Sequence, residues 1–187
     1  VQAAEVDRFV SLYEKAAARG DSFEDSVKLA LAGVLVSPHF LFRVEAGPGD
    51  EEFRLNDFQL ASRLSYFLWM SMPDDELITL AAKGTLREPV VLRQQVRRML
   101  ADPKAEAFSR AFTGQWLGFA ALGIGVKPDA KKFPQFTSQL AEAMKQEPTL
   151  FLLSLLREDG SLLELLDSET TFLNADLARL YGISGVD

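Results

Sequence analysis

The sequence contains no cysteine among its 187 residues, and its one histidine is His39. The absence of cysteine excludes disulfides, thiolate nucleophiles, zinc–thiolate sites and covalent c-type haem attachment within this chain. A single histidine excludes a multi-histidine metal site. No GxSxG motif accompanies that histidine, so a serine hydrolase of the nucleophile-elbow type is excluded as well.

Long apolar runs and a concentrated basic surface are also lacking. The longest apolar run, LFLLSLL at 150–156, is too short to cross a bilayer. The formal net charge of −7 argues against nucleic acid as a ligand, because phosphate neutralisation needs clustered lysine and arginine. The nearest basic cluster, Arg93, Arg97 and Arg98, is interpreted as the solvated face of a helix. We therefore expect neither a membrane span nor a nucleic-acid interface.

Helical periodicity is present along nearly the whole chain, and no alternating strand pattern of convincing length accompanies it. Ser22, Asn56 and Asn174 are suited to N-caps, and Gly20 and Gly182 to helix stops. The expected fold class is all-α, with an N-terminal helical hairpin packed on a larger irregular helical bundle. Helices are expected at about 4–19, 22–36, 56–70, 74–83, 88–101, 104–119, 137–157, 161–166 and 174–181.

The segment AGPGDEEF at 46–53 divides the chain, because two glycines, a proline and three acids in eight residues are typical of a linker. We expect the hairpin at 1–46, the linker at 47–54 and the main helical domain at 55–187. The chain begins at Val1 directly in a helical pattern, so we expect it to be a fragment of a longer multidomain polypeptide.

The stretch LSYFLWMSMPDDEL at 64–77 admits a structural and a functional interpretation. In the structural one, the apolar residues 66–70 are enclosed by protein, Ser71 caps the next helix, and the acids complement its dipole. In the functional one, the stretch forms part of a pocket that faces a ligand. The candidate pocket residues are His39, Arg43, Arg63, Tyr66, Trp69, Asp74 and Asp75.

His39 and the two tryptophans also admit two interpretations each. His39 follows a proline at a helix break, which is typical of a structural histidine. The alternative is a non-covalent haem ligand, with one of the four methionines as the second axial ligand. Trp69 and Trp116 lie near helix ends and are expected to pack in the core instead of forming a sugar-stacking platform.

Several stretches, in this order, resemble two adjoining domains of unknown function from large multidomain proteins of planctomycetes and related bacteria. They are VSPHFLFRVE (36–45), LASRLSYFLWMSMPDDELITLA (60–81), RRMLADPKAEAF (97–108), FTGQWLGF (112–119) and LLDSETTFLNADLARLYGI (165–183). Two residues depart from what that resemblance implies. Met70 stands where a small polar residue is usual, and Pro148 where a helix-compatible acid is usual. Pro148 also predicts a kink or break near Glu147.

The resemblance implies an exported protein, periplasmic or otherwise extracytoplasmic. Many such proteins carry a cytochrome c domain elsewhere, so c-type haem is expected in the parent protein and no cofactor in this chain. The expected partners are other domains of the same polypeptide, among them a cytochrome c domain. The resemblance carries over no established activity, and therefore no catalytic residue.

Three functional hypotheses remain from the sequence. In the first, the chain is a non-catalytic scaffold or interaction module within an exported, cytochrome-associated protein, because packing and capping explain its notable residues. In the second, it is part of an extracytoplasmic, redox-linked enzyme that acts on polymers, and the 123–136 loop and the candidate pocket motivate this. The third is non-covalent haem binding.

Overall fold

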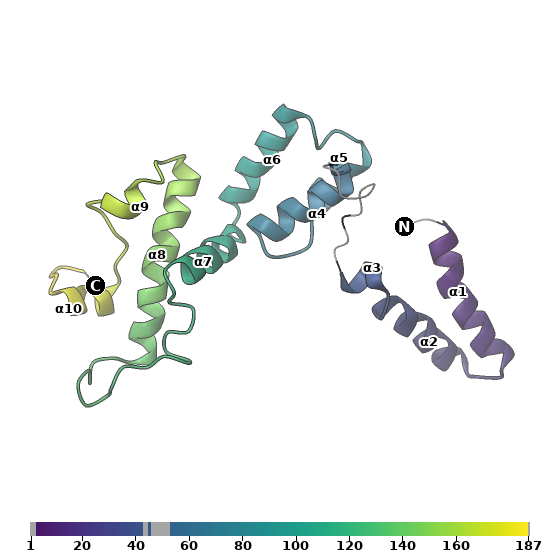
Figure 1. The fold of residues 1–187 in the computed structure, drawn as a ribbon, viewed down its shortest axis with the longest axis horizontal. Coiled ribbons are helices and arrows are strands. Elements are labelled where there is room, and N and C mark those ends of the chain that lie inside the picture. Colours follow the sequence, from purple (N-terminus) through teal and green to yellow (C-terminus); the bar gives the residue numbers. More distant parts are fainter. Residues whose placement is uncertain (1–2, 43–44, 46–52, 187) are drawn as a thin grey trace. The chain divides into compact units, whose positions relative to one another are not determined.

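The computed structural model describes residues 3–42, 45 and 53–186, and within them it contains ten helices and no β-strand (Figure 1). The expected all-α fold class is therefore confirmed. The chain divides into two compact units, unit 1 at Val1–Arg54 and unit 2 at Leu55–Asp187. Among the described helices, none combines the length and the apolar character that crossing a membrane requires.

Unit 1 is a helical hairpin of α1 (Ala3–Ala18) and α2 (Phe23–Leu35), followed by the short α3 (Pro38–Leu41). Gly20 turns the chain with a positive φ of 94°, and the Ser22 side chain accepts a hydrogen bond from the amide of Asp25, as expected of an N-cap. The two helices approach closely at Gly33, where an added Cβ would lie 2.5 Å from Leu12 Cδ1. Few side chains of this unit are buried, so the hairpin has only a small core.

Unit 2 holds the other helices, in two groups that meet where α7 packs on α4 and α8 and where α6 contacts α8. They are α4 (Asp57–Leu68), α5 (Asp75–Ala82), α6 (Pro89–Ala101), α7 (Ala105–Trp116), α8 (Ser138–Glu158), α9 (Glu164–Asp167) and α10 (Ala175–Tyr181). Leu68, Leu77 and Met99 form a buried core shared by α4, α5 and α6. Leu140 and Leu177 belong to a smaller core between α8 and α10.

The N-terminus of α4 has the N-cap that the sequence predicts, and its first helical residue is a buried aspartate. Asn56 and Gln59 form the capping box, each side chain bonding the other's backbone amide at 2.9 Å. Asp57, the first residue of α4, is buried although it carries a charge. Its carboxylate accepts hydrogen bonds from the backbone amide and the Nε of Arg87, and this pairing satisfies the buried charge.

The α4–α5 connection differs from the expected one in two respects. Helix α4 ends at Leu68 instead of Met70, because Met70 adopts a left-handed conformation with φ of 52°. The N-cap of α5 is Asp74 instead of Ser71, and its carboxylate accepts from the amide of Leu77. The carbonyl of Ser71 instead accepts a hydrogen bond from the Ser65 hydroxyl.

Helix α8 continues through Pro148, so the break expected near Glu147 is absent. Proline leaves the carbonyl of Met144 without its backbone donor, and Thr149 Oγ1 donates to the neighbouring carbonyl, that of Lys145, at 2.7 Å. The carbonyl of Thr149 in turn accepts from the Ser109 hydroxyl of α7. Packing of this buried face against α7 outweighs the local preference of proline.

The chain after α9 returns to the middle of α8 at Glu147. The carboxylate of Glu147 accepts hydrogen bonds from Thr171 Oγ1 at 2.6 Å and from the Tyr181 hydroxyl at 2.7 Å. Partial burial, together with this hydrogen bond, raises the pKa of Tyr181 to about 12. The Tyr181 hydroxyl therefore remains a donor at any physiological pH and holds α10 to α8.

Candidate functional site

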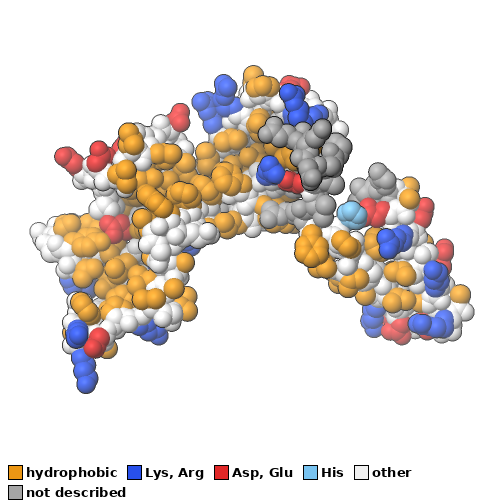
Figure 2. All heavy atoms as spheres, viewed as in Figure 1, with side chains coloured by type: hydrophobic (Ala, Val, Ile, Leu, Met, Phe, Trp, Pro, Cys, Tyr) orange, Lys and Arg blue, Asp and Glu red, His pale blue; other side chains and the backbone are white. Residues whose placement is uncertain are grey.

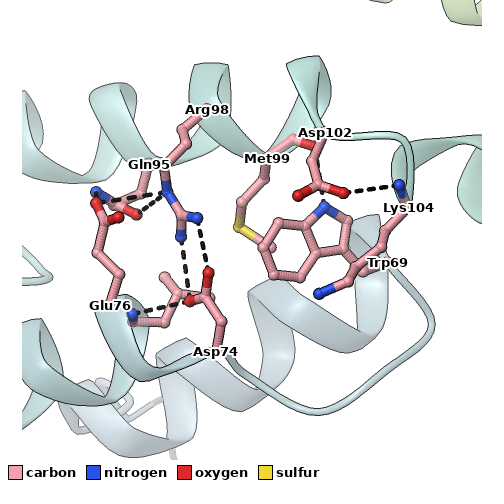
Figure 3. Close-up of polar contacts among 9 residues, drawn as sticks. Trp69, Asp74, Glu76, Gln95, Arg98, Met99, Asp102 and Lys104 are labelled. Carbon is pink, nitrogen blue, oxygen red and sulfur yellow. Dashed lines mark hydrogen bonds and ion pairs between the residues drawn. The ribbon is translucent and has the colours of Figure 1, made fainter.

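Of the seven candidate residues, His39 lies in unit 1 and the other described ones lie in unit 2. Arg43 lies outside the described residues, and His39 is an exposed residue of α3 in unit 1. On α4 and α5, Tyr66, Arg63 and Asp75 are exposed. The two remaining residues, Trp69 and Asp74, both contact the side chain of Arg98 (Figure 3).

Trp69 belongs to the buried core that α4, α5 and α6 share. Its side chain is 3% exposed, and its indole Nε1 donates to the carbonyl of Met99 at 2.9 Å. The Arg98 Cζ lies 5.4 Å from the ring centroid, and the Lys104 Nζ lies 4.5 Å from it. The expectation that Trp69 packs in the core is confirmed, and the two cations add cation–π attraction to that packing (Figure 3).

Asp74 joins the start of α5 to α6. Its carboxylate accepts from Arg98 Nη1 at 2.7 Å and from Nη2 at 3.2 Å, while also capping the helix through the amide of Leu77. Gln95 extends the network, accepting from Arg98 Nε and donating to Glu76 (Figure 3). Arg98 is therefore not on the solvated face of α6, where the sequence placed it.

The electrostatics of this network favour the ionised pair. Partial burial acts to raise the pKa of Asp74, but the hydrogen bonds from Arg98 and the Leu77 amide outweigh it, so the pKa lies below its ordinary value. The hydrogen bond to Asp74 raises the pKa of Arg98 against the opposing effect of burial. A carboxylate that is held ionised by two partners is a poor general acid or base at neutral pH, so this arrangement acts as a clamp.

Removing the charge at this clamp has an expected pH signature. Asp74→Asn keeps an N-cap oxygen but loses the ion pair, and should lower the free energy of unfolding by about 1–2 kcal/mol at pH 7. Because the folded pKa of Asp74 is depressed, its contribution is present above about pH 4 and is lost as the pH falls further. Urea denaturation at several pH values measures this.

The matched control is Asp75→Asn, which removes the same charge from the neighbouring exposed position. It should cost about 0.5 kcal/mol or less, since only the helix dipole is affected. If both variants lost the same stability, with the same pH dependence, the specific pairing of Asp74 with Arg98 would be contradicted.

A different feature of unit 2 is open to solvent: a row of four aromatic rings on α4 and α7. The ring centroids lie 4.9 Å apart between Phe67 and Phe108, 5.9 Å between Phe108 and Phe112, and 5.9 Å between Phe112 and Trp116. Phe67 is 57% exposed and Trp116 is 48% exposed. We call Phe67, Phe108, Phe112 and Trp116 the aromatic row.

The aromatic row belongs to a wider apolar face. Hydrophobic side chains gather over α4, α7 and α8 in the space-filling view (Figure 2). Met70, Leu117 and Leu150 are exposed as well. Two sequence expectations are therefore wrong: Trp116 is not in the core, and the end of α4 is enclosed only at Leu68 and Trp69. Contiguous exposed apolar surface of this kind marks interaction sites in soluble proteins.

Reasoning from the sequence missed the aromatic row, although one signal was present. Phe108, Phe112 and Trp116 recur at i, i+4 and i+8, which places them along one side of a helix. A single apolar stripe is usually the buried one. The buried side of α7 is instead made of small residues: Ala105, Ser109, Thr113 and Gly114.

In the ranges 3–42, 45 and 53–186, no three histidine, aspartate or glutamate side chains come together in a way that could hold a metal ion. Fold and surface together define a two-unit helical protein with a clamped polar cluster and an exposed aromatic face.

Comparison with known families agrees with that class. The profile described as protein of unknown function DUF1592 matches residues 55–183, and the one described as protein of unknown function DUF1595 matches residues 1–45. Since the first match covers more than half of the 187 residues, the chain belongs to the DUF1592 family. Neither the curated proteins nor the solved structures contain a match to it.

Proposed function

We propose that this chain is a non-catalytic interaction module that packs through its apolar face against other domains of the polypeptide to which it belongs. The aromatic row carries the proposal. Three of its rings are at least 44% exposed, and all four lie on helices and form one continuous row of ring contacts. Surfaces that combine aromatic residues with few charges are typical of the core of a protein–protein interface.

The state of the polar residues supports the non-catalytic part of the proposal. The carboxylates of Asp57, Asp74 and Glu147 each accept two or more hydrogen bonds, and each of them joins two elements of the fold. A catalytic acid or base needs a position from which it can reach a substrate. These three groups are already used in holding the helices together.

The wider setting of the proposal comes from the resemblance to planctomycete multidomain proteins. We place the module in an exported protein, in the periplasm or elsewhere outside the cytoplasm. Among the domains that pack on the aromatic row we include a cytochrome c domain, which would carry c-type haem elsewhere in the parent protein. These are proposals, and a pyridine haemochrome spectrum of the parent protein tests the haem.

Hydroxyl-radical footprinting with mass spectrometry tests the interaction directly. It compares the 187-residue chain with the parent protein, residue by residue. In the isolated chain, Phe67, Phe112 and Trp116 should be oxidised readily. In the parent protein their oxidation should fall at least about fivefold, because a partner domain excludes solvent from a hydrophobic interface.

Ile124 provides the internal control, since it is 80% exposed and lies in the loop between α7 and α8. Its oxidation should be similar in both proteins. Equal oxidation of the aromatic row in the two proteins would overturn the proposal. Substrate turnover by the isolated chain would count against its non-catalytic part.

A further inference from the structure

Unit 1 contains an apolar groove between α1 and α2, separate from the aromatic row of unit 2. The groove has a volume of about 770 Å³, and α3 contributes to its lining through His39 and Phe40. It is not closed over: Leu31 is 57% exposed and Phe40 is 60% exposed. The close approach of the helices at Gly33 fixes their spacing. The groove is therefore a built feature of the hairpin.

Two apolar rows at helical spacing line the groove. On α1 they are Val6, Phe9, Val10 and Tyr13, and on α2 they are Val27, Ala30, Leu31 and Val34. From Val6 to Tyr13 the row rises about 10.5 Å along α1, because each helical residue rises 1.5 Å. A partner helix presents side chains at i, i+3, i+4 and i+7 over the same length. The dimensions of the groove thus match about two turns of a third helix.

The polar residues of the groove are not spread evenly. Glu5 lies in the first turn of α1, and Ser37 and His39 follow the end of α2. In an antiparallel hairpin these positions lie at the same end. One end of the groove is therefore polar and carries one carboxylate, and the rest of its lining is apolar. A basic side chain on the partner, one turn beyond its apolar residues, would complement Glu5.

We propose that the hairpin groove binds an amphipathic α-helix that carries large apolar residues at i, i+3, i+4 and i+7 and an arginine or lysine at the end facing Glu5. This inference rests on the proposed function as an interaction module and names a second docking surface with its partner chemistry. Laying an apolar helix face into a groove is a recurrent mode of recognition. The added helix would also complete the core that the hairpin lacks.

The test uses the whole 187-residue chain and a fluorescein-labelled designed peptide. The peptide has leucines at i, i+3, i+4 and i+7 and one arginine. A second peptide of the same composition distributes the leucines around the helix. Fluorescence anisotropy should show saturable binding of the first peptide only, and circular dichroism should show that it becomes helical on binding.

Three variants locate the site. Leu31→Lys and Val10→Lys replace exposed groove residues, so the fold should persist, and peptide binding should weaken at least about tenfold. Glu5→Gln should weaken it about threefold, the size of an exposed ion pair. Phe112→Lys, the matched change on the aromatic row, should leave it unchanged.

Other outcomes overturn the inference. Equal binding of both peptides would mean non-specific apolar contact, and binding unaffected by Leu31→Lys would place the peptide elsewhere. A dimer in sedimentation velocity that Leu31→Lys dissociates would show that a second copy covers the groove. If peptide binding failed while the aromatic row was protected in the parent protein, the proposed function would stand and only the groove assignment would fall.

Discussion

Trp69→Ala should lower the free energy of unfolding of unit 2 by about 3–5 kcal/mol, the largest loss expected of any single truncation in the polar cluster. The indole is 3% exposed and packs among Leu68, Leu77 and Met99, so its removal leaves a cavity. It also leaves the Met99 carbonyl without its donor and removes the ring that Lys104 overlies. Urea denaturation followed by far-ultraviolet circular dichroism measures the loss.

Trp116→Ala is the matched control, because Trp116 is the only other tryptophan and is 48% exposed. It should cost about 1–2 kcal/mol, since about half of the side chain already faces water. Trp69→Phe separates two causes. Phenylalanine keeps most of the side-chain volume but lacks the indole N–H donor. This variant should therefore still lower the free energy of unfolding by about 1–3 kcal/mol. Equal losses at both tryptophans would contradict the assignment of core and surface.

The positions of the helices could be predicted from the sequence more reliably than the burial of individual side chains. Helix positions follow from periodicity and from caps such as Asn56 and Asn174, whose hydrogen bonds reach only three residues along the chain. Such signals are contained in any short window of the sequence. The ends of the nine expected helices were therefore predicted to within three residues, and α4 ends two residues early because Met70 is left-handed.

Partners far apart in the sequence could not be predicted in that way. Asp57 binds Arg87 thirty residues away, and Asp74 binds Arg98 across twenty-four. Nothing local in the sequence distinguishes Arg87 or Arg98 from the other arginines of the chain. Which face of a helix is buried also depends on neighbours. Small residues on one side of α7 admit α8, and this leaves Phe112 and Trp116 outside.

The candidate site illustrates both limits. Trp69 and Asp74 were named as candidate pocket residues, and their neighbour Arg98 was assigned to the solvated face of α6. If Arg98 is not considered, the aromatic and acidic side chains of 64–77 have no evident partner, and the stretch suggests a pocket. With it, the same residues form a clamp between α5 and α6. The identity of one long-range partner changes the interpretation from binding to structure.

Pro148→Ala should raise the free energy of unfolding by about 2 kcal/mol. A proline within a helix costs about 3 kcal/mol relative to alanine, and about 1 kcal/mol is returned because alanine leaves the unfolded chain more flexible. Helix α8 runs unbroken through this position, so alanine needs no new backbone path. Its amide can donate to the carbonyl of Met144, which proline leaves without that donor. Thermal and urea denaturation measure the gain.

Gln146→Ala serves as the control, because Gln146 is exposed on the same helix and its backbone donor is already present. It should change stability by about 0.5 kcal/mol or less.

A loss of stability in Pro148→Ala would mean that the proline sets a local bend on which neighbouring segments depend. The hydrogen bonds of Glu147 to Thr171 and Tyr181 lie beside it and would then be weakened. The pKa of Tyr181, raised to about 12 by burial and by its bond to Glu147, would fall toward its ordinary value and report that change. A gain in stability with this pKa unchanged would show that packing against α7 alone holds α8 continuous.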